Sequence, residues 1–112
     1  TFAVIFIELP QFTEAVNELV DDASYLEFQK ELLAMPDRGD VMQGSGGLMK
    51  VRMRLPGRGK SGGARVIYLF LKQHDVIILF YLYTKAKSET LTAAQLKSLK
   101  TAVAVIKQQF RP

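Results

Sequence analysis

The sequence predicts an α+β fold with a small, twisted, mainly antiparallel sheet, an N-terminal strand, two helices packed on one face and a C-terminal helix. Three β-rich segments lie between residues 48 and 83, and segments with helical spacing lie on both sides of them. A chain of 112 residues that is 48% hydrophobic is long enough for one core and too short for two. We therefore expect a single domain over residues 1–112.

The first part of the chain predicts one strand and two helices. The segment "FAVIFIEL" is rich in β-branched and aromatic residues, and Pro10 ends it. Apolar residues recur at helical spacing over residues 12–20, which predicts a short amphipathic helix. A second helix is expected to begin at a capping box of Ser24 and Glu27 and to end at Pro36. Its apolar stripe consists of Tyr25, Phe28, Leu32 and Met35.

A glycine-rich loop, three strands and a helix are expected in the rest of the chain. The loop is "GDVMQGSGG", and the segments "LMKVRMRL", "RVIYLFLK" and "DVIILFYLY" predict antiparallel strands, the last two joined by a hairpin turn at "QHD". The last strand is apolar on both faces, which is typical of a central strand. A capping box of Thr92 and Gln95 then begins the helix. Its apolar stripe consists of Leu96, Leu99, Val103, Ile106 and Phe110.

Basic residues are concentrated in the middle of the chain. Between Val41 and His74 there are seven Lys and Arg residues and no Asp or Glu. Strand alternation places Lys50, Arg52 and Arg54 on one face. Positive charges with no negative charges among them repel one another, and a chain tolerates such a segment best when its partner is a polyanion. Because these cations lie on strand and loop, not on a basic amphipathic helix, they favour nucleic acid over a membrane surface. The candidates for base stacking are Tyr68, Tyr81 and Tyr83.

The triplet Gly59-Lys60-Ser61 matches the end of a phosphate-binding P-loop, but the rest of that motif is missing. Arg54 stands where the motif needs a glycine, and a strand is predicted where the motif needs a helix. We therefore expect no nucleotide cofactor, and interpret this segment as a basic hairpin loop that approaches an RNA backbone. The chain has no cysteine, and its one histidine, His74, lies in a predicted turn, so we also expect no metal site.

Several segments resemble one known family. The stretches "GDVMQGSGGLMKVRM", "GRGKSGGARVIYLF" and "YTKAKSETLT", with "VIFIELPQF" at the start, resemble the HigB branch of the RelE superfamily, the toxin half of bacterial toxin–antitoxin pairs. The resemblance implies a sheet with helices on one face and a basic groove on the other. It also implies an endoribonuclease that cuts mRNA in the ribosomal A site, beside the 16S rRNA, and an antitoxin from an adjacent gene. Because no apolar run approaches the roughly 20 residues of a spanning helix, we expect a cytoplasmic protein, and the resemblance implies a bacterial one.

The resemblance further implies which residues act. The expected catalytic residues are Lys50, Arg52, Arg65, Tyr83 and Lys87. The expected RNA- and phosphate-binding residues are Arg54, Arg58, Lys60 and Lys85. Metal-free cleavage proceeds by attack of the 2′-OH on its own phosphate, which needs a base, an acid and positive charge on the phosphorane. Lys50 is the expected base, and Arg65 is expected to hold the phosphate through its planar fork. The sequence departs from the family at Met49, where relatives often carry arginine.

Two other functions remain open from the sequence. A toxin related to ParE shares the fold and acts on DNA gyrase without nuclease activity, although the basic strand and loop weaken this interpretation. A plain RNA-binding module would use the same cations with no chemistry. For Arg58 and Lys60 an ordinary phosphate contact is the favoured role, and Tyr83 is balanced between an acid or stacking role and a strand aromatic.

Overall fold

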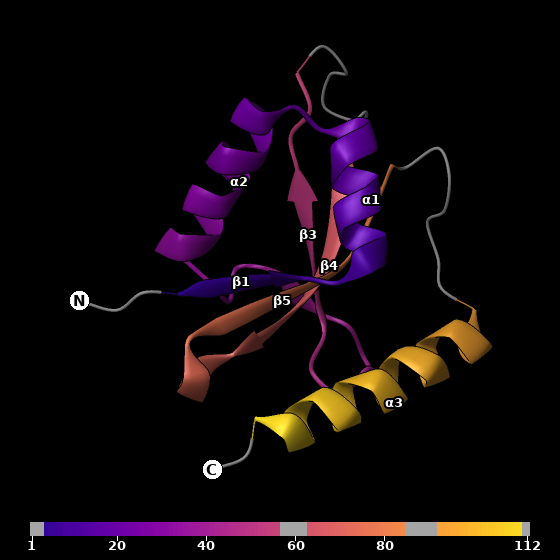
Figure 1. Cartoon of the computed structure of the whole chain (residues 1–112). Helices are drawn as coiled ribbons and strands as arrows, with labels where there is room; N and C mark the ends of the chain where they lie inside the picture. The colour runs from indigo at the N-terminus through magenta and orange to yellow at the C-terminus, as the bar shows by residue number, and fades with distance from the viewer. Residues whose placement is uncertain (1–3, 57–62, 85–91, 111–112) are drawn as a thin grey trace.

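The computed structural model contains a sheet of five strands in the order β1-β5-β4-β3-β2 (Figure 1). The structure describes residues 4–56, 63–84 and 92–110. The strands are β1 (Ile5–Glu8), β2 (Asp40–Val41), β3 (Met49–Met53), β4 (Ala64–Leu71) and β5 (Val76–Thr84). The helices are α1 (Pro10–Leu19), α2 (Asp22–Ala34) and α3 (Ala93–Gln109).

The strand pairing confirms a mainly antiparallel sheet with the N-terminal strand at one edge. β1 runs parallel to β5, with residues 5–8 opposite residues 76–79, and the other pairs are antiparallel. β5 lies between β1 and β4, as its two apolar faces predicted. Ile67 pairs with Tyr81 and Tyr68 with Leu79, so Phe80 is the extra residue of a β-bulge.

Helices cover both faces of the sheet, with α1 and α2 on one face and α3 on the other (Figure 1). The buried core under α1 and α2 includes Phe12, Phe28, Leu32, Met53, Val66 and Leu79. The buried core under α3 includes Leu48, Ile67, Leu69, Ile78, Leu99 and Val103. The expected cover of α1 and α2 on one face is therefore confirmed, and α3 shares the face on which a basic groove was expected.

The first residues of each helix explain where the helix begins, because the first backbone N–H groups of a helix have no partner within it. Pro10 stands at the first position of α1, where its missing N–H costs nothing. Asp21 caps α2, because its Oδ1 accepts from the Ser24 N–H at 2.7 Å, so the capping box expected at Ser24 is wrong. The box at α3 is confirmed: Thr92 accepts from the Gln95 N–H at 3.1 Å and donates its own N–H to Gln95 Oε1 at 2.9 Å.

Three further local expectations differ from the structure. Met35 was expected in the apolar stripe of the second helix, but α2 ends at Ala34 and Met35 is 57% exposed. The predicted hairpin turn is a 3₁₀ helix over Lys72–His74, followed by Asp75 in the left-handed region with a φ of 53°. The expected glycine-rich loop contains β2, which pairs with the start of β3.

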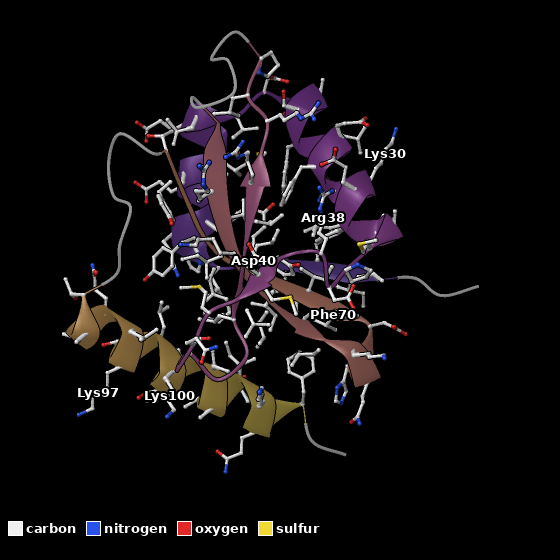
Figure 2. All side chains as sticks on the ribbon, turned by 180° about the vertical axis from the view of Figure 1, so that it is seen from behind. Lys30, Arg38, Asp40, Phe70, Lys97 and Lys100 are labelled. Atoms are coloured by element: carbon white, nitrogen blue, oxygen red, sulfur yellow. The ribbon has the colours of Figure 1, made fainter. Side chains whose placement is uncertain are left out.

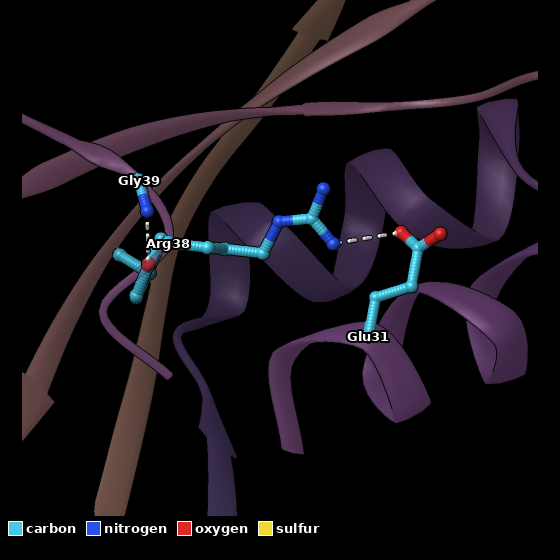
Figure 3. A network of polar contacts seen from close by, with 4 residues as sticks. Glu31, Arg38 and Gly39 are labelled. Carbon is cyan, nitrogen blue, oxygen red and sulfur yellow. Dashed lines mark hydrogen bonds and ion pairs between the residues drawn. The ribbon is translucent and has the colours of Figure 1, made fainter. Parts of the chain in front are cut away.

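Hydrogen bonds fix the connection between α2 and β2. The Tyr68 hydroxyl, at the centre of β4, donates to the Pro36 carbonyl at 2.8 Å and accepts from the Gly39 N–H at 3.0 Å. A Cβ at Gly39 would lie 3.0 Å from that hydroxyl, so glycine allows this close approach. Arg38 reaches back to Glu31 of α2 in an ion pair of 3.3 Å (Figure 3).

The loop between β2 and β3 is tied to α3. Lys107 Nζ donates to the Gly46 carbonyl at 2.7 Å. The buried Ser45 hydroxyl donates to the Met42 carbonyl at 2.6 Å and accepts from the Leu48 N–H at 2.9 Å. The position of α3 is therefore linked to the strand that carries Lys50 and Arg52.

Candidate active site

A row of three side chains crosses the sheet on the face shared with α3. Arg52 of β3 is directly opposite Arg65 of β4, and Arg65 is directly opposite Tyr83 of β5. Residues paired in this way have Cβ atoms roughly 4.5–5.5 Å apart and share a face. Lys50 lies on the same face, because it pairs with Ile67 of the core under α3. We call Arg52, Arg65 and Tyr83 the Arg65 row.

The alternation of β3 explains why cations line this face. Met53 and Leu55 are buried under α1 and α2, and Val51 packs against the same core, so the residues between them point the other way. The predicted division of this strand into an apolar face and a basic face is confirmed. Met49 is half-buried and packs against the core under α1 and α2.

The members of the Arg65 row differ in their exposure to solvent. Arg52 is exposed, while Lys50, Arg65 and Tyr83 are half-buried. The one hydrogen bond found for Arg65 in the described chain is a long one of 3.5 Å from Nη1 to the neighbouring Ala64 carbonyl. Like charges placed directly opposite each other destabilise a sheet. An anion between Arg52 and Arg65 would remove that repulsion.

The other residues expected at the site are only partly placed. Arg54 is exposed and follows the end of β3. The expected residues Arg58, Lys60, Lys85 and Lys87 lie outside the described residues. Among the described residues, Met53, Ala64 and Thr84 lie together at one end of the sheet, since Ala64 pairs with both of the others.

Two residues considered from the sequence lie away from the row. Tyr68 is fully buried on the opposite face, and its hydroxyl is used by the α2–β2 connection, so a stacking role for Tyr68 is wrong. His74 is exposed in the 3₁₀ turn beyond the far end of β4, with its ring 5.5 Å from the Phe110 ring. The expectation of a surface turn residue is therefore confirmed for His74.

A groove of about 490 Å³ lies between α3 and the sheet, directly beside the row. Tyr83 belongs to both, and Ile67, the cross-strand neighbour of Lys50, also lines the groove. Sequence reasoning missed this feature. The sequence does contain a signal for the groove. Ala94, Ser98 and Ala102 recur along one side of α3, and their small side chains leave space between the helix and the sheet.

Charge is distributed unequally along the chain. Only Asp75 and Glu89 of the eleven acidic residues follow Val41, whereas thirteen of the fifteen Lys and Arg residues do. Lys97 and Lys100 extend this positive charge onto the exposed side of α3 (Figure 2). The face that carries the row and α3 is therefore suited to a polyanion.

Within the described parts of the chain, no three His, Cys, Asp or Glu side chains are grouped so that they could hold a metal ion. None of the helices described in the structure is long and apolar enough to cross a bilayer.

The chain is similar to known toxins in sequence and structure. A family model described as the RelE toxin of the RelE / RelB toxin-antitoxin system matches residues 28–110. A mutant of E. coli toxin RelE in the free state is 16% identical, with a TM-score of 0.57 over 91% of this chain and 98% of that chain. The intact E. coli RelBE toxin-antitoxin complex matches at 18% identity and a TM-score of 0.57, covering 79% of this chain and 100% of that chain.

A third match is archaeal. The RelE–RelB complex from Pyrococcus horikoshii OT3 is 24% identical, with a TM-score of 0.51 over 78% of this chain and 100% of that chain. At these identities the solved structures establish the fold. The family model extends from within α2 to the end of α3 and includes every residue of the Arg65 row. The chain therefore belongs to the RelE toxin family of toxin–antitoxin systems.

Proposed function

We propose that this protein is the toxin of a type II toxin–antitoxin pair and acts as a ribosome-dependent endoribonuclease, an mRNA interferase that cuts mRNA in the A site, beside the 16S rRNA, and stops translation. The observation that carries the proposal is the Arg65 row, which places two guanidinium groups and a phenol side by side on one face of the sheet. The glycine-rich basic stretches favour the HigB branch. The proposed setting is the bacterial cytoplasm, with residues 1–112 acting as one domain.

The proposed reaction is attack of the RNA 2′-OH on its own phosphate, with no metal and no cofactor. Arg65, between two row neighbours, would hold the phosphate through its planar fork, and Arg52 would stabilise the charge that develops on the phosphorane. Lys50 would accept the 2′-OH proton, and Tyr83 would protonate the leaving oxygen or stack on a base. Lys87 completes the proposed catalytic set. The proposed contacts to the RNA backbone are Arg54, Arg58, Lys60 and Lys85.

We further propose that a cognate antitoxin from an adjacent gene binds this chain. β1 lies at the edge of the sheet, and Ile5 and Ile7 on it are 58% and 36% exposed. An edge strand with exposed apolar side chains can be covered by a strand from a partner. Complexes with RelB are the form in which two of the similar toxins were solved. Copurification of a small protein from the adjacent gene would support this proposal, and full yield of a harmless free chain without that gene would contradict it.

The proposed ribosome dependence follows from the chemistry of the row. Cations bind RNA and stabilise the phosphorane, but in-line attack also needs the 2′-OH, phosphorus and leaving oxygen aligned. Fixing such a geometry contributes on the order of 7–11 kcal/mol in favourable intramolecular cases, and a ribosome that grips the codon would supply it.

The test compares one message and one toxin concentration in low-salt buffer, with and without programmed ribosomes. We expect cleavage only with ribosomes, and none from the Arg65→Ala variant. Equal cleavage of naked RNA would contradict ribosome dependence. Cleavage in neither tube, together with growth arrest and DNA damage in cells, would indicate a gyrase-directed toxin instead. Binding without cleavage or growth arrest would indicate a plain RNA-binding module.

A further inference from the structure

The groove beside the Arg65 row has an aromatic wall that depends on the bulge in β5. In a regular strand Tyr81 would share a face with Leu79, which is buried under α1 and α2. The extra residue Phe80 shifts the alternation, so that Phe80, Tyr81 and Tyr83 all line the groove on the α3 side. Tyr81 is 38% exposed, so part of this wall is accessible from solvent.

The groove and the row have complementary chemistry. Among the described residues that line the groove, none carries a charge, and the polar groups are those of Gln11, Gln95, Ser98 and the two tyrosines. The row directly beside it carries two arginines, with Lys50 next to Ile67 at the groove floor. A nucleotide has the same division, with a charged phosphate at one end and a flat, uncharged base at the other. A volume of about 490 Å³ lies within the range of small-ligand sites.

We propose that this groove receives one base of the RNA whose phosphate lies on the Arg65 row. The proposal rests on the proposed function, which it extends by naming a base-binding subsite. The base stacks against Tyr81 or Tyr83, and amide and hydroxyl groups meet its edge. The Gln95 Oε1 already accepts the Thr92 N–H, so the remaining amide hydrogens of Gln95 are donors for a base that presents acceptors.

Binding of nucleoside monophosphates tests the subsite without ribosomes or cleavage. Each of the four monophosphates is compared with ribose 5′-phosphate, which has the same phosphate and sugar but no base, by NMR titration at low salt. Stacking on one aromatic ring gives a preference of roughly tenfold, so we expect at least one monophosphate to bind about tenfold more tightly than ribose 5′-phosphate. Equal affinities for all five ligands would overturn the proposal.

Matched variants assign the preference to the groove. Ala94→Phe and Ser98→Phe fill the groove from α3, so we expect them to bind the monophosphate and ribose 5′-phosphate with nearly equal affinity. Ala104→Phe is the control, because Ala104 lies on an exposed part of α3 and does not line the groove, and we expect it to keep the tenfold preference. Arg65→Ala is expected to weaken all ligands equally. Thermal unfolding confirms that each variant is folded. A preference that persists in both filled variants would place the base elsewhere and overturn the proposal.

The outcome separates this inference from the proposed nuclease. A tenfold base preference that the filled variants lose, in a protein that cuts no message on the ribosome, would contradict the nuclease and leave the subsite standing. Ribosomal cleavage by a protein with no base preference would contradict the subsite alone. Where both hold, mapped 5′ ends of cut mRNA should show a different base composition next to the cut for Ala94→Phe than for Ala104→Phe.

Discussion

Arg65 is the residue on which most of the proposed chemistry depends, because it is the only member of the row with a row neighbour on each side. Arg52 and Tyr83 flank it across two strand pairs. A guanidinium presents its donors in a fixed plane that matches two phosphate oxygens, whereas an ammonium acts as a point charge. The same charge on a lysine would therefore bind the phosphate without orienting it.

Arg65→Ala is expected to lower cleavage on the ribosome roughly 10²-fold or more and to abolish growth inhibition, because a transition-state donor is lost. Arg65→Lys should recover RNA binding but little cleavage. The measurement is the cleavage rate of a programmed message, with thermal unfolding as the control for stability. A purified Arg65→Ala protein that melts like the wild type and still arrests growth would remove Arg65 from the mechanism.

Tyr68→Phe is expected to lower the free energy of unfolding by about 1–3 kcal/mol, because the Gly39 N–H and the Pro36 carbonyl both lose their partner. Tyr81→Phe is the matched control. Tyr81 is 38% exposed, so loss of its hydroxyl should change the free energy of unfolding by less than about 0.5 kcal/mol. Urea unfolding of the two variants gives the comparison. Equal stabilities would mean that the Tyr68 hydroxyl does not secure the α2–β2 connection.

At the scale of single residues, the sequence predicted on which face of a strand a side chain lies, but not which other elements contact it there. Alternation placed Lys50 and Arg52 together correctly, because each strand residue points opposite to its neighbour. Alternation also treated Tyr68 and Tyr83 as equivalent strand aromatics. Which of them is buried depends on what covers each face, and that is decided by helices distant in sequence.

At the scale of elements, capping residues define where the helices begin. Asp21 and Ser24 are both good N-cap residues, and the capping-box pattern of Ser24 and Glu27 led to the wrong one. In the structure Asp21 is the N-cap residue, and its carboxylate accepts hydrogen bonds from both the backbone N–H and the hydroxyl of Ser24. These hydrogen bonds, above all the one from the Ser24 N–H, lower the pKa of Asp21 below its ordinary value of 3.8.

This pKa shift predicts a pH dependence for the stability of α2. The folded-state pKa is lowered, so the charged cap stabilises the fold above the unfolded-state pKa, and the stabilisation is lost as the pH falls through the folded-state value. Asp21→Asn keeps a capping oxygen but removes the charge. We expect wild type to be more stable than Asp21→Asn near neutral pH and the difference to vanish in acid below the lowered pKa. Urea unfolding across this range measures it, and a pH-independent difference would contradict the linkage.

Other elements were less accessible from the sequence because they depend on pairing between distant strands. The two residues of β2 are strand only because they pair with Met49 and Lys50. The bulge at Phe80 follows from the register between β4 and β5, and the apolar run in β5 shows no break in pattern. The groove depends on this bulge and on the position of α3, so no single segment of the sequence could predict it.

At the scale of the whole molecule, charge is separated between two faces. The acidic residues are concentrated on α1, α2 and their connections, and the face with the Arg65 row and α3 is basic. Such a distribution orients an approaching polyanion before contact and gives binding that weakens as salt rises.

We expect the logarithm of the affinity for a single-stranded RNA to fall linearly with the logarithm of the salt concentration, by about 0.7 for each phosphate neutralised. Arg65→Ala should reduce the slope by about 0.7, since one contact is lost. Fluorescence anisotropy at several salt concentrations measures both slopes. An affinity independent of salt would mean that the basic face does not bind the RNA backbone.

The parallel pairing of β1 with β5 also determines the order in which the chain can fold during synthesis. Residues 5–8 leave the ribosome well before their partners at residues 76–79. Contacts between such distant segments form late, because a long loop must close before they contribute. The acidic helices α1 and α2 are therefore made before the strands of the basic face, and α3 is made after Tyr83. The order of its strands thus delays assembly of the basic face until β5 and α3 have been made.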